Sequence, residues 1–368
     1  MLLKMSDFMI QECIDAEKCL GGQFMIRWNN DYNHGAHPEI LKAFLETNEN
    51  SYGGYGIDQW CEMAAAEIKK HLGDVNADVH FMVGGTQVNY TVIAAALRPF
   101  QGVISADEGH INTHETGAVE NTGHKIHQLK SENGKITALQ IKEEAEKFVC
   151  SGTKEHITQP KMVYISYPTE YGTIYSKKEL EEIRKVCDEY NFYLFVDGAR
   201  LGYGLGSCES DITLADLAGV ADAFYIGGTK CGAMMGEAVV LTNDELKPNF
   251  RSYMKQHGAM LAKGWTLGLQ FYTLFKDDLY FQITKKADEF AMRIKKAFAE
   301  KSIPEYIESP TNQQFVILTD EQKAKLDENH IYEYMNKVAE DKHLVRFCTS
   351  WSTCEADVEK LIEDIKGL

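Results

Sequence analysis

The sequence lacks any apolar run long enough to cross a membrane, and its cysteines do not follow a metal-binding pattern. The nine cysteines are scattered without a C-x-x-C pair, which is typical of reduced thiols in a cytoplasmic protein. The N-terminus lacks the charged segment, apolar segment and cleavage site of a signal peptide. We therefore expect a cytoplasmic protein with no membrane span and no metal site.

Positive charge is also scarce. The chain has 38 lysines and arginines against 55 acidic residues, a net charge of -17. Nucleic acids and anionic membranes attract basic surfaces, so this balance argues against both as partners. No G-x-G-x-x-G motif follows the first predicted strand, which argues against an NAD-binding enzyme.

The patterning that is present predicts an α/β fold. Hydrophobic residues make up 44% of the 368 residues, enough for one large domain and a smaller one. Short, nearly continuous apolar runs alternate with helical segments, and such runs mark strands covered on both faces. We expect a mostly parallel sheet sandwiched by helices. The predicted strands are 79–83, 103–105, 162–166, 193–196, 223–226 and 238–241.

The pattern of apolar and helical segments divides the chain into three parts. We predict a lead-in over 1–28, a large α/β domain over 29–250 and a small α+β domain over 251–368. We expect part of the first fifty residues to return to the small domain. That domain should contain a long helical region, two strands and a closing helix, over 265–300, 314–318, 344–348 and from 355.

Two segments about thirty residues apart carry the strongest chemical pattern. Asp197 ends a buried strand in Phe195-Val196-Asp197-Gly198-Ala199-Arg200, and Lys230 follows another strand in Ile226-Gly227-Gly228-Thr229-Lys230. An enzyme that uses pyridoxal 5'-phosphate needs a carboxylate that keeps the pyridine nitrogen protonated and a lysine that binds the aldehyde covalently. Each motif alone is weak, but their order and spacing together favour this cofactor.

Other residues fit the same cofactor. Gly84-Gly85-Thr86 lies between a predicted strand and helix, where backbone N–H groups can bind a phosphate, although such a motif also simply begins helices. His110 follows another strand and can stack on a planar ring. His110 and His114 are four residues apart, but no third metal ligand has suitable spacing.

Two arginines are candidates for binding a carboxylate. Arg200 follows Asp197 closely enough to lie beside the ring oxygen or the substrate carboxylate. Arg346 lies between apolar residues in a predicted strand, where it either holds a carboxylate bidentately or forms a structural ion pair.

In this order, the motifs resemble the threonine aldolase and β-eliminating lyase family of fold-type-I pyridoxal phosphate enzymes. The resemblance covers about 29–354 and includes Asn30-Asp31, Tyr55-Gly56-x-Asp58, Gly84-Gly85-Thr86, His110 with Glu115 and Gly117, Asp197-Gly198-Ala199-Arg200, Thr229-Lys230 and Arg346. It implies that Gly85 and Thr86 bind the phosphate, His110 stacks on the ring and Asp197 pairs with its nitrogen. By the same resemblance Lys230 binds the aldehyde, and Arg200 and Arg346 hold the substrate carboxylate, with Asn30 beside them.

The family builds its active site across a subunit interface, which implies a homodimer or homotetramer with shared sites. The chain departs from the family pattern at three places. Thr229 stands where a serine is usual, and Lys263 stands near the place of an arginine, where it would reach the phosphate from a neighbouring subunit. The segment Ser166-Tyr167-Pro168-Thr169-Glu170-Tyr171 replaces an acidic residue followed by Asn-Thr.

The predicted function is a lyase that uses pyridoxal phosphate to cleave the Cα–Cβ bond of a β-hydroxy-α-amino acid into glycine and an aldehyde. The alternatives with the same cofactor are β-elimination and transamination. A protein that binds pyridoxal phosphate without turnover is the alternative outside enzymes. The general base stays open between His110, His34 and a water.

Overall fold

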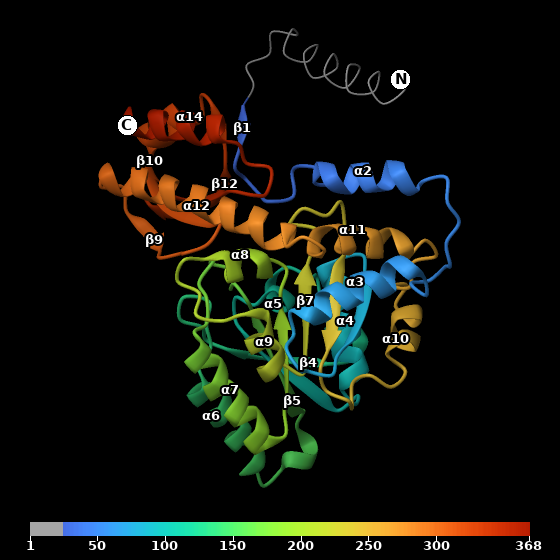
Figure 1. The fold of residues 1–368 in the computed structure, drawn as a ribbon. Coiled ribbons are helices and arrows are strands. Elements are labelled where there is room, and N and C mark those ends of the chain that lie inside the picture. Colours follow the sequence, from blue (N-terminus) through green and yellow to red (C-terminus); the bar gives the residue numbers. More distant parts are fainter. Residues whose placement is uncertain (1–24) are drawn as a thin grey trace.

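The computed structural model describes residues 25–368, so most of the predicted lead-in over 1–28 lies outside the described residues. A seven-stranded sheet forms the centre, in the order β2-β8-β7-β6-β5-β3-β4 (Figure 1). Strand β8 is antiparallel to both neighbours, and the other four pairings are parallel. The strands are β2 (Asp78–Met82), β3 (Gln101–Ala106), β4 (Lys125–Leu129), β5 (Gln159–Ser166), β6 (Tyr193–Asp197), β7 (Ala223–Gly227) and β8 (Glu237–Leu241).

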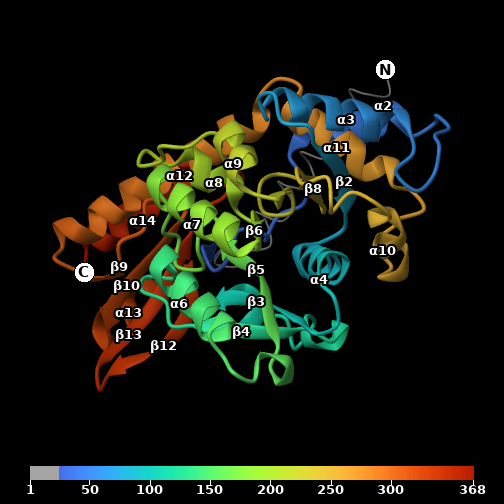
Figure 2. The same cartoon turned by 90° about the horizontal axis from the view of Figure 1, so that it is seen from below.

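Helices cover both faces of this sheet, which explains the nearly continuous apolar strands (Figure 2). Residues of α4 and α10 pack in one core cluster, and residues of α3, α6, α7, α9 and α11 pack in another. The predicted α/β sandwich is therefore confirmed. The helices of this part are α2 (Pro38–Thr47), α3 (Gln59–Lys70), α4 (Gly85–Ala96), α5 (His110–Thr113), α6 (Ala138–Val149), α7 (Lys177–Tyr190), α8 (Leu201–Gly206), α9 (Leu214–Val220), α10 (Phe250–Gln256) and α11 (Trp265–Phe275).

Local signals set several helix ends. Helix α7 begins with a reciprocal capping box between Ser176 and Glu179. The long helical region predicted over 265–300 is confirmed, and it consists of two helices, α11 and α12 (Leu279–Glu300). Asp278 adopts φ 57°, a left-handed conformation that ends the run before α12 begins.

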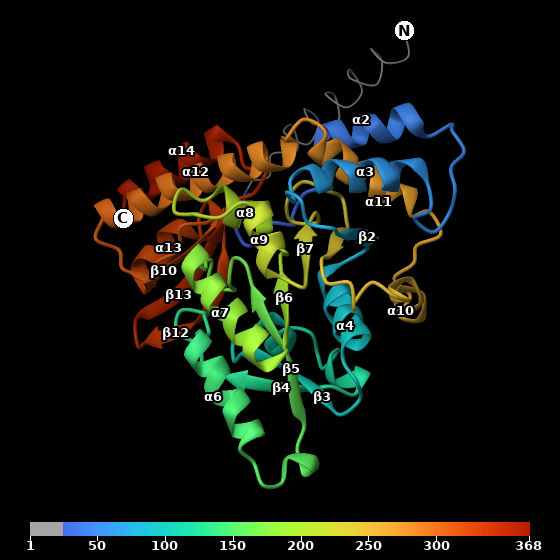
Figure 3. The ribbon, with the colours of Figure 1, turned by 60° about the horizontal axis from the view of Figure 1, so that its bottom comes forward.

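A second, four-stranded antiparallel sheet lies beside α12 and α14 (Figure 3). The prediction found its two buried strands and missed two edge strands, whose half-buried or exposed residues mix polar and apolar types without a regular alternation. The sheet has the order β12-β13-β10-β9. The remaining elements are β9 (Glu305–Ile307), β10 (Gln313–Thr319), α13 (Asp320–Leu326), β11 (His330–Ile331), β12 (Glu333–Ala339), β13 (Lys342–Cys348) and α14 (Glu355–Lys366).

The N-terminal part of the described chain joins both units. Strand β1 (Ile26–Arg27) pairs with β11, and Trp28 packs in the small core with residues of α12 and α14. Helix α2 instead packs against α11 of the large unit (Figure 3). Among residues 25–368, no helix has both the length and the apolar character that a membrane crossing needs.

Candidate active site

A pocket of about 260 Å³ opens at the carboxyl ends of the parallel strands. Asp197 ends β6, and Lys230 follows β7 by three residues. Because the carboxyl ends of parallel strands meet at one edge of a sheet, residues far apart in the sequence converge here. Six of the predicted site residues line the pocket, namely Gly85, Thr86, His110, Asp197, Arg200 and Lys230.

The Asp197 carboxylate is buried and fully hydrogen-bonded. Its burial opposes the charge, but the nearby His110 and the hydrogen bonds to the carboxylate outweigh that effect and hold the pKa of Asp197 below its usual value. The group therefore stays ionised at neutral pH. Oδ1 accepts hydrogen bonds from Ala199 N (3.0 Å) and the Tyr225 hydroxyl (2.5 Å), and Oδ2 accepts from the Tyr164 hydroxyl (2.5 Å) and Asn89 Nδ2 (3.1 Å).

A buried chain of hydrogen bonds links Asp197 to His110. The Asn89 amide also donates to Oε1 of Glu115 at 2.7 Å, and the same oxygen lies 2.8 Å from Nδ1 of His110. Burial lowers the pKa of His110, but the hydrogen bond to Glu115 and the negative charges of Asp197 and Glu115 outweigh it and raise the pKa. His110 therefore holds a proton more readily than an ordinary histidine.

The lysine is held in a polar turn. Burial and the charge of Arg200 lower the pKa of Lys230, although Asp31, Asp197 and Glu237 oppose the shift. The buried Glu237 accepts hydrogen bonds from Gly228 N at 2.9 Å and from the Thr229 hydroxyl at 2.8 Å. Burial raises the pKa of Glu237 to about 8. A lysine with a lowered pKa is neutral more often, and the neutral amine is the nucleophile.

The Arg200 guanidinium is bound by a residue from the N-terminal segment. Asp31, which is 1% exposed, accepts from Nε at 2.6 Å and from Nη2 at 2.9 Å. Asn312 from the loop before β10 donates to Asp31 at 3.0 Å. This bidentate pair fixes Arg200 and, within residues 25–368, leaves its Nη1 without a hydrogen bond.

Comparison with known proteins agrees with this geometry. The sequence model described as beta-eliminating lyase matches residues 38–341, most of the chain. The chain belongs to the β-eliminating lyase family.

The proteins similar to this chain include threonine aldolases. The solved threonine aldolase of Leishmania major is 42% identical, with a TM-score of 0.90, over 93% of this chain and 99% of that one. The low specificity L-threonine aldolase of Pseudomonas sp. (strain NCIMB 10558) is 28% identical over 92% of this chain and 96% of its own length. Aspartate aminotransferase of Thermus thermophilus (15% identity, TM-score 0.67, 97% of this chain and 95% of that one) shares the fold.

Three of the predicted site residues do not line the pocket at Lys230. Asn30 lines a separate cavity of about 250 Å³, and its Oδ1 accepts from Tyr32 N. Lys263 is exposed. Arg346 on β13 donates to Gln313 Oε1 (3.2 Å) and Asn29 O (3.0 Å), and its Nε is buried without a partner.

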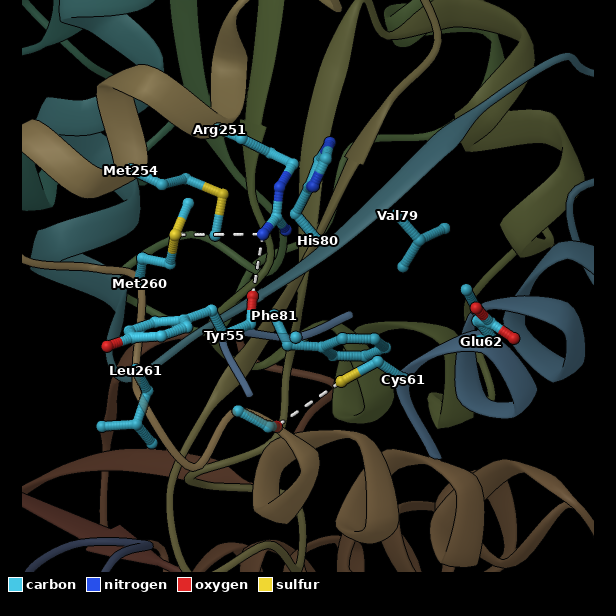
Figure 4. Close-up of a pocket in the computed structure, with 13 residues that line it drawn as sticks. Tyr55, Cys61, Glu62, Val79, His80, Phe81, Arg251, Met254, Met260 and Leu261 are labelled. Atoms are coloured by element: carbon cyan, nitrogen blue, oxygen red, sulfur yellow. Dashed lines mark hydrogen bonds between the residues drawn. The ribbon is translucent and has the colours of Figure 1, made fainter. Parts of the chain in front are cut away.

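A third cavity, of about 150 Å³, is lined by residues from the loop before α3 and from the segment around Lys263 (Figure 4). Contacts at this cavity hold the two segments together. Arg251 donates to the Tyr55 carbonyl oxygen at 2.9 Å, and its Nη2 lies 3.8 Å from the Met260 sulfur. The Cys61 thiol lies 3.5 Å from the Gly264 carbonyl oxygen. These contacts fix both ends of the short segment that carries Lys263. This cavity shares no lining residue with the pocket at Lys230.

Glycine is required at two places where the backbone passes close to Tyr225. A Cβ on Gly198 would lie 1.8 Å from the Tyr225 carbonyl oxygen. A Cβ on Gly85 would lie 2.8 Å from the Tyr225 hydroxyl, which is the group that donates to Asp197. These two glycines therefore allow the strand ends to approach closely enough to enclose the carboxylate.

Sequence reasoning missed three acidic residues of the site. Asp31 belongs to the Asn30-Asp31 motif of the family resemblance, but nothing in the sequence pairs it with Arg200. Glu170 follows β5 by four residues and Glu237 begins β8, and both line the pocket. An acid beside the end of a buried strand is the signal that would have found them.

Proposed function

We propose that this protein uses pyridoxal 5'-phosphate to cleave a β-hydroxy-α-amino acid, with threonine as the model substrate, into glycine and an aldehyde. The observation that carries the proposal is the convergence of the Lys230 amine and the Asp197 carboxylate in one pocket. The supporting relative is the threonine aldolase of Leishmania major, at 42% identity.

The residues of the pocket fit this cofactor. No side chain caps the N-terminus of α4, so its first N–H groups are available to a phosphate, with the Thr86 hydroxyl beside them. Asp197, ionised and buried, would pair with the pyridine nitrogen. When bound, the cofactor supplies an aldehyde carbon for amines and a protonated ring that withdraws electrons.

The other residues of the site orient the reactants and hold protons. Lys230 with its lowered pKa is neutral more often than an ordinary lysine, and His110, whose pKa is raised, lines the pocket. The unpartnered Nη1 of Arg200 and the buried, unpartnered Nε of Arg346 are donors for a substrate carboxylate. Asn30 stands next to Asp31 and is proposed to border the substrate from the N-terminal segment.

The proposed assembly is a homodimer or homotetramer with shared active sites. Large apolar side chains are exposed on α2, α3 and the loop between them, which supports an interface there. Lys263 lies near this surface and is proposed to reach the phosphate of a neighbouring subunit. The exposed apolar residues are Leu41, Leu45, Tyr55, Ile57 and Met63.

The cellular location and the domain division are also proposals. The seven cysteines within residues 25–368 are free, which supports a reducing compartment and hence the cytoplasm. The separate core cluster of α12, α14 and the antiparallel sheet supports a division of the chain into a large and a small domain. Because α10 and α11 pack in the core clusters of the large unit, we place the boundary after α11 and not at the predicted 250/251.

The experiment incubates the purified protein, loaded with pyridoxal phosphate, with threonine and measures glycine, acetaldehyde and 2-oxobutyrate separately. We expect equal amounts of glycine and acetaldehyde. Formation of 2-oxobutyrate and ammonia without glycine would instead identify β-elimination. Borohydride should attach the cofactor to Lys230, as located by peptide mass spectrometry, and Lys230→Ala should abolish turnover while the fold remains. Attachment to another lysine would contradict the proposal.

A further inference from the structure

Three carboxylates line the pocket at Lys230, and they differ in how many of their oxygens are occupied. Both oxygens of Asp197 accept two hydrogen bonds each. Both oxygens of Glu237 are also occupied, by the Gly228 N–H and the Thr229 hydroxyl. Glu170 accepts hydrogen bonds from other residues only through Oε1. Among the carboxylate oxygens of the three pocket acids within residues 25–368, only Oε2 of Glu170 accepts no hydrogen bond from another residue.

The Glu170 carboxylate is fixed in place. Its Oε1 accepts from the Ser166 hydroxyl at 2.7 Å and from the His110 backbone N–H at 2.8 Å. Ser166 is the last residue of β5 and lies opposite Asp197 in the parallel pairing of β5 with β6. The Glu170 carboxylate is therefore held between the end of β5 and the first turn of α5, at the same edge of the sheet as Asp197.

The electrostatic surroundings suit a group that takes up a proton. Burial raises the pKa of Glu170, and the negative charge of Asp197 adds to the rise, while the hydrogen bond from Ser166 opposes it. A carboxylate with a raised pKa is a stronger base than an exposed one, since its protonated form is relatively more stable.

The two histidines considered as bases are less suitable. His110 has a raised pKa and lies with Nδ1 against Glu115, so it holds a proton more readily than an ordinary histidine and releases it less readily. His34 lines the separate cavity beside Asn30, and its Nδ1 lies 2.9 Å from the Ser352 hydroxyl. His34 therefore does not line the pocket, and His110 is less suited than Glu170 wherever its ring is protonated.

We propose that Glu170 is the catalytic base that accepts the β-hydroxyl proton of the substrate through Oε2. This inference rests on the proposed aldol cleavage. As the Cα–Cβ bond breaks, the O–H electrons form the carbonyl bond of the aldehyde, and the proton passes to Glu170. The electron pair of the broken bond stays with Cα, which then takes up one proton and becomes the methylene of glycine. Atoms and charges balance without an oxidant, a reductant or a co-reactant.

The experiment separates cleavage of the Cα–Cβ bond from exchange of the Cα proton. Glu170→Gln retains an acceptor for Ser166 and for the His110 N–H but cannot take up the proton. We expect its rate of threonine cleavage to fall by about 100-fold or more, the range of general base catalysis. Its rate of glycine α-proton exchange in D₂O, followed by NMR, should stay within about threefold of wild type, because glycine has no β-hydroxyl group. The matched control is Glu108→Gln, an exposed glutamate near His110 that does not line the pocket.

Two results would overturn the role of Glu170. One is cleavage within about threefold of wild type, and the other is an equal loss of cleavage and exchange, which would indicate a positioning role. If Glu170→Gln cannot be purified folded, the two rates are measured for Glu170→Ala with and without formate. Restoration of cleavage by formate would support the proposal, and its absence would contradict it. Failure of the proposed function is distinct, because then wild type itself would exchange glycine protons without cleaving threonine.

Discussion

The ion pair between Asp31 and Arg200 offers a quantitative test of how the N-terminal segment supports the pocket. The side chain of Asp31 is fully enclosed and that of Arg200 is 15% exposed. Asp31→Asn removes the negative charge and leaves the guanidinium without a counter-charge. Breaking one side of a buried pair costs about 3–5 kcal/mol. We therefore expect the free energy of unfolding to fall by about that amount.

The change should be visible in thermal unfolding. An unfolding entropy of about 2.1 cal/mol/K per residue, applied to 368 residues, converts this loss into a Tm lower by about 4–7 °C. Burial raises the pKa of Asp31, but the charges of Arg200 and Lys230 outweigh it and hold the pKa below its usual value. The difference in stability between wild type and Asp31→Asn should thus be present at neutral pH and begin to shrink as the pH falls below about 4, where the unfolded state takes up the proton. It should vanish only below the lowered pKa of Asp31 in the folded protein.

The control is Asp74→Asn, which removes the same charge from an exposed position and should leave Tm unchanged. The double variant Asp31→Asn/Arg200→Gln should lose less stability than the sum of the two single variants, because neither charge is then left unpaired. An Asp31→Asn protein with wild-type Tm, or a double variant equal to the sum, would refute the reasoning.

Three further predictions concern other charged groups. Asp197→Asn should bind the cofactor more weakly and lower turnover by several orders of magnitude, since about 3–5 kcal/mol depends on that charge; steady-state rates and cofactor titration check this, and a near-normal rate would remove Asp197 from its role. Asp288 is 3% exposed with neither oxygen in a hydrogen bond of ordinary geometry, and burial raises its pKa, although the Asn312 N–H partly offsets the rise. The folded state then keeps a proton that the unfolded state releases above pH about 4. Relative to Asp288→Asn, wild type should therefore lose about 1.4 kcal/mol of stability per pH unit above that pH, until the folded pKa is reached. Unfolding curves of the two proteins, measured side by side, should differ more at pH 7 than at pH 5. Arg346→Lys should raise the KM for the amino acid by more than tenfold, because roughly 2–5 kcal/mol is lost with a bidentate charged contact; a lower Tm with unchanged KM would show that Arg346 is structural.

The sequence alone determined the architecture and the family. Continuous apolar strands and glycine-rich strand ends are local signals, so the α/β sandwich and the two buried strands of the small sheet were both predicted. The residues of the Asp-Gly-Ala-Arg motif and the later lysine lie on strand ends, and their convergence follows from parallel topology.

Only the tertiary structure decided which polar groups are partners. Asp31 and Arg200 are separated by 169 positions, and Asn89 and Asp197 by 108, so no local pattern relates them. The same holds for Glu170, whose free oxygen is visible only once its other oxygen is seen to bind Ser166 and His110. A helix or strand follows from the periodicity of its own residues, whereas a buried charge is stable only where the folded chain brings donors or a counter-charge to it.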